Sequence, residues 1–133
     1  NKFSKSIVIP AKNEEKNLEP LIMRIPKFTD LETIIVCGKS KDKTLDETKR
    51  LIQVYGDLNI KVLEQTKNGK ANAVFEAIKF SQNELIAILD ADISVDPETL
   101  EDFFGLIEEG KADFVNGTRF VYRKEKHSMR FFK

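Results

Sequence analysis

Leu85-Ile-Ala-Ile-Leu89-Asp90-Ala91-Asp92 is the stretch of sequence that decides the fold. An unbroken apolar run of this length is typical of a strand covered on both faces, as in a parallel sheet. Two carboxylates spaced i, i+2 follow it directly. Ligands of open α/β sheets bind at the carboxyl ends of strands, where such a pair can offer oxygens to a hard divalent cation such as Mg²⁺ or Mn²⁺.

The acids after this strand also have a plainer explanation, because Asp is common in turns and at helix N-caps. Asp96-Pro97 fits that explanation, with Asp96 as the N-cap and Pro97 at the first helical position. Asp90 and Asp92 come too early in the chain to cap the same helix. We therefore interpret Asp96 as structural and favour metal or phosphate chemistry for Asp90 and Asp92.

Composition limits the class of protein. The 133 residues, 41% of them hydrophobic, suit a single domain over 1–133. Lys plus Arg and Asp plus Glu number 22 each, so we expect no nucleic-acid partner. Cys37 is the single cysteine, which excludes an internal disulfide and suggests packing, and the single His127 offers no zinc-ligand spacing. No apolar run is long enough to span a bilayer, and we expect a longer parent protein beyond Lys133.

Strand and helix signals alternate along the chain, which predicts an α/β fold with a mainly parallel sheet and helices on both faces. Strands are expected over residues 6–10, 33–37, 60–63 and 85–89, with a fifth starting at 113–116. Helices are expected over 13–25 and 97–109, with two more between them whose inward positions are Leu45, Leu51, Ile52 and Val54, and Ala71, Val74, Phe75 and Ile78.

The loops after the first, second and fourth strands carry most of the polar groups: 12–14, 38–42 and 90–92. Parallel strands bring these loops to one rim, and a strand order that reverses beside the first strand opens a nucleotide-sized crevice there. The sequence contains neither Gly-x-Gly-x-x-Gly after the first strand nor a P-loop, which argues against a dinucleotide site or a P-loop NTPase. The first strand ends in Pro10, which argues against a phosphatase with Asp-x-Asp at that place.

Four motifs occur in order along nearly the whole chain: Ile7-Val-Ile-Pro10-Ala-Lys-Asn13-Glu14-Glu15, Gly38-Lys-Ser40-Lys-Asp42-Lys-Thr44, Asn68-Gly69-Lys70 and Leu89-Asp90-Ala-Asp92. Together they resemble the family 2 glycosyltransferases, especially the branch of dolichol- or polyprenyl-phosphate mannose synthases. Asn116-Gly117-Thr118-Arg119 and the basic, aromatic stretch after it resemble the same branch.

The resemblance implies a GT-A fold, a Rossmann-like three-layer α/β/α domain that holds a GDP- or UDP-linked sugar and a divalent cation, Mg²⁺ or Mn²⁺. It implies transfer of the sugar with inversion to an acceptor such as a polyprenyl or dolichyl phosphate. By this resemblance the nucleotide-sugar contacts are Pro10, Lys12, Glu14, Gly38, Asp42, Lys70, Asp90 and Ala91. The implied metal-side residues are Asp92, Asp90 and Ser94, and the implied catalytic residues are Asp92 and Arg119.

Three positions depart from the family's usual pattern. Lys12 stands where many members have an aromatic residue, Cys37 where they have an acid, and Gly38 where many have Asp. The nucleobase of the donor therefore stays open. Lys70 either faces the donor or is ordinary helix surface. A non-catalytic sugar-nucleotide-binding or regulatory domain of the same fold, and a nucleotidyltransferase, are the alternative functions.

Basic and aromatic residues alternate at the carboxyl end of the chain: Arg119, Phe120, Tyr122, Arg123, Lys124, Lys126, Arg130, Phe131, Phe132 and Lys133. Such a segment can attract an acceptor phosphate or an anionic membrane surface, or it can be a solvated loop. Arg119, directly after the expected fifth strand, is the best candidate to meet a phosphate. We expect a cytoplasmic protein, associated with the membrane if the acceptor is a lipid, and the sequence leaves a homodimer open.

Overall fold

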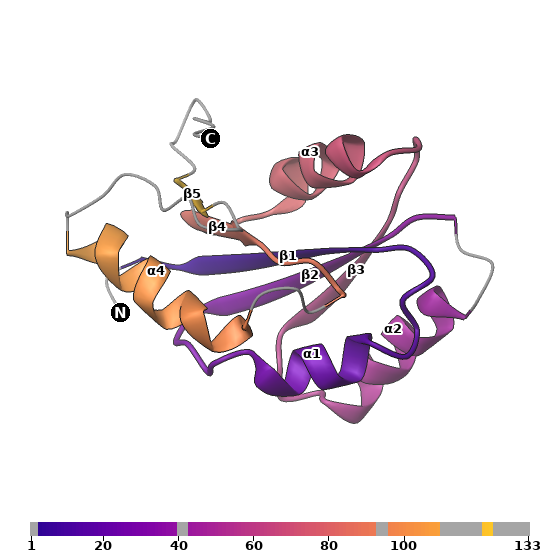
Figure 1. The fold of residues 1–133 in the computed structure, drawn as a ribbon, viewed down its shortest axis with the longest axis horizontal. Helices are drawn as coiled ribbons and strands as arrows, with labels where there is room; N and C mark the ends of the chain where they lie inside the picture. The colour runs from indigo at the N-terminus through magenta and orange to yellow at the C-terminus, as the bar shows by residue number, and fades with distance from the viewer. Residues whose placement is uncertain (1–2, 40–42, 93–95, 110–120, 124–133) are drawn as a thin grey trace.

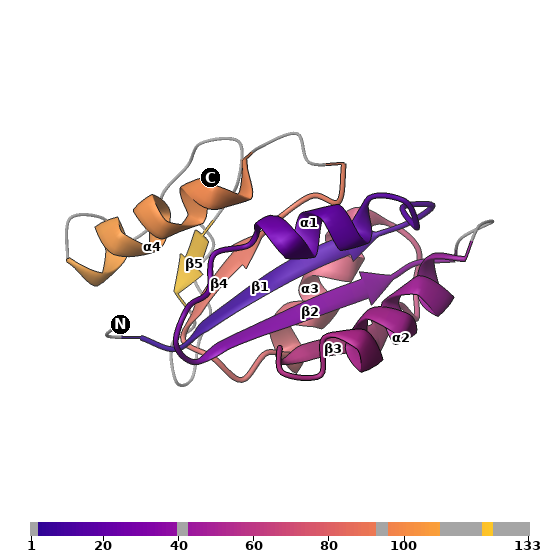
Figure 2. The same cartoon turned by 90° about the horizontal axis from the view of Figure 1, so that it is seen from below.

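The computed structural model describes residues 3–39, 43–92, 96–109 and 121–123. Within these ranges, five strands form one sheet in the order β3-β2-β1-β4-β5 (Figures 1 and 2). The strands are β1 (Lys5–Ala11), β2 (Leu31–Cys37), β3 (Ile60–Glu64), β4 (Leu85–Ile88) and β5 (Val121–Arg123). Strands β1 to β4 are parallel and β5 is antiparallel to β4, which confirms the predicted α/β class with a mainly parallel sheet.

Helices cover both faces of the sheet, as the alternation predicts. The described helices are α1 (Leu18–Arg24), α2 (Thr44–Val54), α3 (Lys70–Phe80) and α4 (Leu100–Glu108), with a short 3₁₀ turn η1 (Pro97–Thr99) before α4. Figure 1 shows α3 on one side of the sheet and α1, α2 and α4 on the other, and Figure 2 shows α1 in front of the strands, with α4 on one side of it and α2 on the other. The described part of the molecule therefore has three layers.

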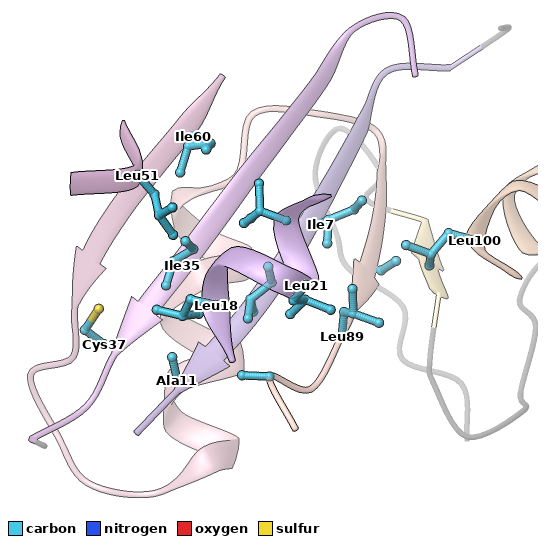
Figure 3. Close-up of a cluster of buried hydrophobic side chains, with 14 of the residues drawn as sticks. Ile7, Ala11, Leu18, Leu21, Ile35, Cys37, Leu51, Ile60, Leu89 and Leu100 are labelled. Carbon is cyan, nitrogen blue, oxygen red and sulfur yellow. The ribbon is translucent and has the colours of Figure 1, made fainter. Parts of the chain in front are cut away.

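Side chains alternate between the two faces along each parallel strand and build two cores. On the face of α1, α2 and α4, Ile7, Ile35 and Leu89 are fully or almost fully buried against helix residues such as Leu21 (Figure 3). On the face of α3, Val8, Ile34 and Ile86 pack against Ala73, Ala77 and Ile78. Strands buried on both faces have continuous apolar runs, which is why Leu85–Leu89 could be recognised from the sequence.

Two helix predictions were wrong in detail. The first helix begins at Leu18, because the predicted start at residue 13 is a turn in which Asn13 has a left-handed φ of 57°. In α3 the buried face is made by Ala73, Ala77 and Ile78, whereas Ala71 and Phe75 are exposed. The small alanine side chains let the helix lie close to the sheet, and a phenylalanine would hold it away.

Two further predictions concern Val54 and the fifth strand. Val54, predicted to face inward from α2, is exposed. Residues 113–116, predicted to start the fifth strand, lie outside the described residues, and the strand that pairs with β4 is Val121–Arg123.

Two phenylalanines of opposite exposure test these helix faces. Phe104 on α4 is 1% exposed and packs edge-on against Phe28, with the ring centroids 5.3 Å apart, whereas Phe75 on α3 is 50% exposed. We expect Phe104→Ala to lower the free energy of unfolding by about 3–5 kcal/mol, because it leaves a cavity in the core. Phe75→Ala should change it by less than about 0.5 kcal/mol. Urea unfolding measures both, and equal losses would contradict the assignment of the α3 face.

Candidate functional site

A pocket of about 370 Å³ lies at the carboxyl edge of the sheet, on the side of α3. It is bounded by the ends of β1 and β2, the first turn of α3 and the loop after β4. Seven residues that the sequence predicts for the site line it: Pro10, Lys12, Glu14, Lys70, Asp90, Ala91 and Asp92. Ala11, Val36, Gln65, Gly69 and Ala73 also line it.

The pocket opens where β1 and β4 stop pairing. The last ladder bond between them runs from the Leu89 amide to the Val8 carbonyl, 2.9 Å, so the backbone polar groups of Val8 face β4. Backbone groups alternate in direction along a strand, so those of Pro10, two residues on, face the same way. Proline has no N–H to continue the ladder, whereas β1 stays paired with β2 as far as Ala11. Pro10 therefore marks the point at which the crevice begins.

An ion pair crosses the pocket from helix to loop. Lys70 is the first residue of α3, and its Nζ lies 2.6 Å from Oδ1 of Asp90. The Lys70 side chain is 62% exposed and that of Asp90 is 22% exposed, whereas Asp92 is at the surface of the same loop. Gly69 precedes the helix with a φ of 103°, a conformation that glycine adopts without strain. At this end of the pocket, Lys70 thus lies opposite the carboxylate of Asp90, with Asp92 on the same loop.

The loop after β1 is held in shape by hydrogen bonds. The Glu14 amide donates to Oγ1 of Thr44 at the start of α2, 3.0 Å, and Nδ2 of Asn17 donates to the Glu14 carboxylate, 2.6 Å. These bonds fix the backbone of Glu14 and orient its side chain. Lys12 is exposed at the mouth of the pocket.

Gln65 is a site residue that the sequence reasoning missed. It follows β3 and lines the pocket, and its Nε2 donates to the Gly69 carbonyl, 2.6 Å, at the entry to α3. A side chain at Gly38 would come within 3.2 Å of Gln65 Oε1, so the glycine is explained by this close approach and not by a left-handed turn. The rule that polar residues after parallel strands gather at one rim, applied to the third strand as well, would have found Gln65.

The carboxylates of the pocket suit a hard cation shared with a phosphate ligand. Among the described residues no group of three or more His, Cys, Asp or Glu side chains is arranged to hold a metal by itself. Mg²⁺ is commonly held by one or two carboxylates together with the phosphates of a substrate, and Mn²⁺ accepts the same oxygen ligands. Asp92 and Asp90 fit this donor set. Ser94, also predicted on the metal side, lies outside the described residues, as do Asp42 and Arg119.

The segment after the acidic loop is anchored by Arg24 of α1. The Arg24 guanidinium contacts both carboxylate oxygens of Glu98, at 2.9 and 3.0 Å, and Oδ1 of Asp96 at 3.0 Å. Arg24 thereby lowers the pKa of Glu98. Asp96 does stand at the N-cap position before Pro97, but its carboxylate makes no capping bond, because it is turned toward Arg24. The predicted capping role of the Asp96 side chain is therefore wrong, and its carboxylate pairs with Arg24 instead.

Cys37 is packed in the core, as the sequence suggests. It is buried on the face of α1 and α2, with its sulfur 3.5 Å from Oγ1 of Thr48 (Figure 3). Burial raises the pKa of the thiol. The side chain therefore faces away from the pocket, which lies on the side of α3.

A polar pocket at the point where the strand order reverses places the protein among the α/β proteins that bind ligands beyond the carboxyl ends of their strands. Residues 6–132 match the family model "Glycosyl transferase family 2". The chain belongs to this family, and its fold is the GT-A fold.

Two curated relatives illustrate the likeness. A dolichol-phosphate mannosyltransferase of Pyrococcus furiosus is 31% identical over 120 residues, which are 87% of this chain and 33% of the relative. An uncharacterized glycosyltransferase of Synechocystis is 38% identical over 121 residues, 86% of this chain and 37% of the relative. The chain thus spans about a third of the length of these relatives.

Two solved structures show the same fold. One is a mannosyltransferase of Pyrobaculum calidifontis in complex with GDP-Man and Mn²⁺, with 28% identity and a TM-score of 0.61 over 69% of this chain and 28% of that chain. The other is TarS 1-349 of S. aureus in complex with UDP, with 27% identity and a TM-score of 0.68 over 86% of this chain and 37% of that chain. In the described part of our chain, no helix has the length and apolar character needed to cross a membrane.

The Arg24 anchor can be tested against a matched arginine. Arg50 makes the same kind of contact, with both oxygens of Glu47 and one of Glu19, but does not touch the segment after the acidic loop. We expect Arg24→Gln to speed hydrogen exchange at the Thr99 amide, which bonds to the Asp96 carbonyl, by about threefold or more, because the segment opens more often. Arg50→Gln should leave this amide unchanged.

The effect of Arg24 should also depend on pH. The folded-state pKa of Glu98 is lowered by Arg24. The stabilising contribution of the Arg24–Glu98 pair is therefore fully present at neutral pH and is lost as the pH falls through that lowered pKa. In acid, the Thr99 amide should therefore exchange at the same rate in the unaltered protein and in Arg24→Gln. A difference in rate that persists below that pKa would contradict the role of the ion pair.

The Cys37 thiol gives a test of its buried position. Burial and the raised pKa leave little accessible thiolate in the folded chain, so we expect reaction with Ellman's reagent at pH 8 to be at least about tenfold slower than in denaturant. Equal rates in the two conditions would place Cys37 at the surface.

Proposed function

We propose that the protein is a glycosyltransferase that moves a sugar from a nucleotide-diphospho-sugar, linked to GDP or UDP, to an acceptor. The observation that carries this proposal is the pocket itself, in which Lys70, Asp90 and Asp92 converge where β1 and β4 separate. Cationic and metal-binding groups side by side suit a diphosphate, and a neighbouring cleft suits a nucleoside. Membership of the family supports the same function.

In this proposal the pocket takes the donor by its nucleoside and its diphosphate. Pro10, Lys12 and Glu14, with Ala91, border the nucleoside, and Gly38 and Asp42 shape the neighbouring loop. Lys70 contacts the phosphates. One similar structure holds GDP-Man and another holds UDP, so both nucleotides are candidates for this chain.

We further propose that a divalent cation, Mg²⁺ or Mn²⁺, is held by Asp92 with Asp90 and Ser94. When bound, it neutralises charge that builds on the leaving nucleoside diphosphate. Asp92 is exposed and lines the pocket, where its carboxylate could ligate a cation that a bound diphosphate also ligates. The Mn²⁺ complex of the similar mannosyltransferase supports this choice of ion.

The transfer step in this proposal is a single displacement at the anomeric carbon of the sugar. An oxygen of the acceptor forms a bond to the anomeric carbon while the bond from that carbon to the diphosphate oxygen breaks, and the electron pair leaves with the nucleoside diphosphate. Attack from the opposite side inverts the configuration. Lys70 and Arg119 would stabilise negative charge on phosphate groups during this step.

We propose a polyprenyl or dolichyl phosphate as the acceptor, on the cytoplasmic face of a membrane. The relative from P. furiosus named for dolichol-phosphate mannosyl transfer supports this class. A phosphate acceptor is already ionised at neutral pH and needs no general base.

Calorimetric titration with GDP and with UDP, each with and without Mn²⁺, tests the donor site. We expect one nucleotide to bind in the presence of Mn²⁺, and Asp92→Asn to weaken that binding by about tenfold or more, because a neutral amide is a poor ligand for a hard cation. Asp102→Asn is the matched control, since it removes an exposed carboxylate of α4 that does not line the pocket. It should bind like the unaltered protein.

Two results would contradict the proposal. Folded protein that binds neither nucleotide with Mn²⁺ has no donor site of this kind. Equal losses from Asp92→Asn and Asp102→Asn would mean that general charge, and not a site at Asp92, governs the affinity.

A further inference from the structure

Lys70 occupies a position that helix electrostatics disfavour. It is in the first turn of α3, where the aligned peptide dipoles create partial positive charge, and α3 has no acidic residue in that turn. The other described α-helices each have an acidic residue in the first turn. The carboxylate that stabilises Lys70 comes instead from Asp90, across the pocket, at 2.6 Å.

This ion pair also changes what Asp90 offers to a cation. The ammonium group at Oδ1 offsets part of the negative charge of Asp90, and a divalent ion that approached Asp90 would be repelled by Lys70. A cation in the empty pocket is therefore held weakly until phosphate oxygens supply further ligands.

A nucleoside diphosphate provides a second partner for Lys70. The Lys70 side chain is 62% exposed and lines the same pocket as both acids, so its flexible stem can carry the ammonium from Asp90 to a phosphate oxygen. The exchange keeps Lys70 paired in both states and frees Asp90 for the cation.

We propose that Lys70 makes the binding of the cation and of the nucleotide depend on each other, by pairing with Asp90 in the empty pocket and with the diphosphate in the filled one. This inference rests on the proposed donor site. By linkage, the nucleotide raises the affinity for the cation by the same factor as the cation raises the affinity for the nucleotide. Removal of Lys70 lowers this factor.

The test measures Mn²⁺ binding directly, by the electron paramagnetic resonance signal of free Mn²⁺, with and without saturating GDP or UDP. In the unaltered chain we expect weak binding of Mn²⁺ alone and binding at least about tenfold tighter with the nucleotide. In Lys70→Met we expect Mn²⁺ alone to bind about three- to tenfold tighter than in the unaltered chain, and the nucleotide to add less than about threefold.

Two variants act as controls. Lys79→Met removes a lysine from the last turn of the same helix, where it lies over the Phe75 ring at 4.4 Å, and should bind Mn²⁺ and nucleotide like the unaltered chain. Lys70→Arg retains a cation that can pair with Asp90 and should restore weak binding of Mn²⁺ alone. Melting temperatures establish that each variant is folded.

The outcomes separate this inference from the donor site on which it rests. If the unaltered chain binds Mn²⁺ and nucleotide together but Lys70→Met leaves the affinity for Mn²⁺ alone unchanged or lower, the inference is wrong and the donor site stands. If Lys79→Met has the same effect as Lys70→Met, the effect is one of general charge and the inference is wrong. If the unaltered chain binds neither nucleotide with Mn²⁺, both proposals are wrong.

Discussion

The missing N–H of Pro10 is the constraint on which the site depends. Strands β1 and β4 are paired through Val8 and Leu89, and they separate at the next position of β1 that faces β4, which is Pro10. Any other residue there would have an amide able to extend the ladder, and continued pairing would bring the two strand ends together. The reversal of strand order opens the crevice, Pro10 marks the point at which β1 and β4 stop pairing, and the polar loops are arranged around it.

The acidic loop beside this crevice is fixed from both sides. Before it, Leu89 is hydrogen bonded to Val8 and buried in the core. After it, Arg24 holds Glu98, and at the far end of α4 the buried Lys5 contacts Glu108 at 3.3 Å. Such anchoring favours the cation site proposed for this loop, because ligands already close to their bound geometry lose less conformational entropy on binding.

The parts of the structure that the sequence could predict are those with a strong local signal. Leu85–Leu89 was recognisable because a doubly covered strand is apolar throughout. Asp90 and Asp92 followed from their place at a strand end, and Pro10 followed from the family resemblance. The inner face of α3 was not predictable in this way. Ala73 and Phe75 are both apolar, and which of them faces the sheet depends on how closely the helix approaches it, a property of packing across elements. The start of α1 was missed because Asn13 adopts a left-handed turn, to which asparagine is suited but which it does not require.

The positions that depart from the family's usual pattern acquire a physical meaning in the structure. Cys37 points into the core beside Thr48, on the face opposite the pocket. The cysteine that stands in place of the usual acid therefore puts no charge into this buried position. Gly38 leaves room for Gln65, and a side chain there would press on the amide of Gln65. Gln65 in turn bonds to the Gly69 carbonyl and so reaches the turn that presents Lys70. Gln65 thus connects the start of the second loop, at Gly38, to the turn before α3 that presents Lys70 to Asp90.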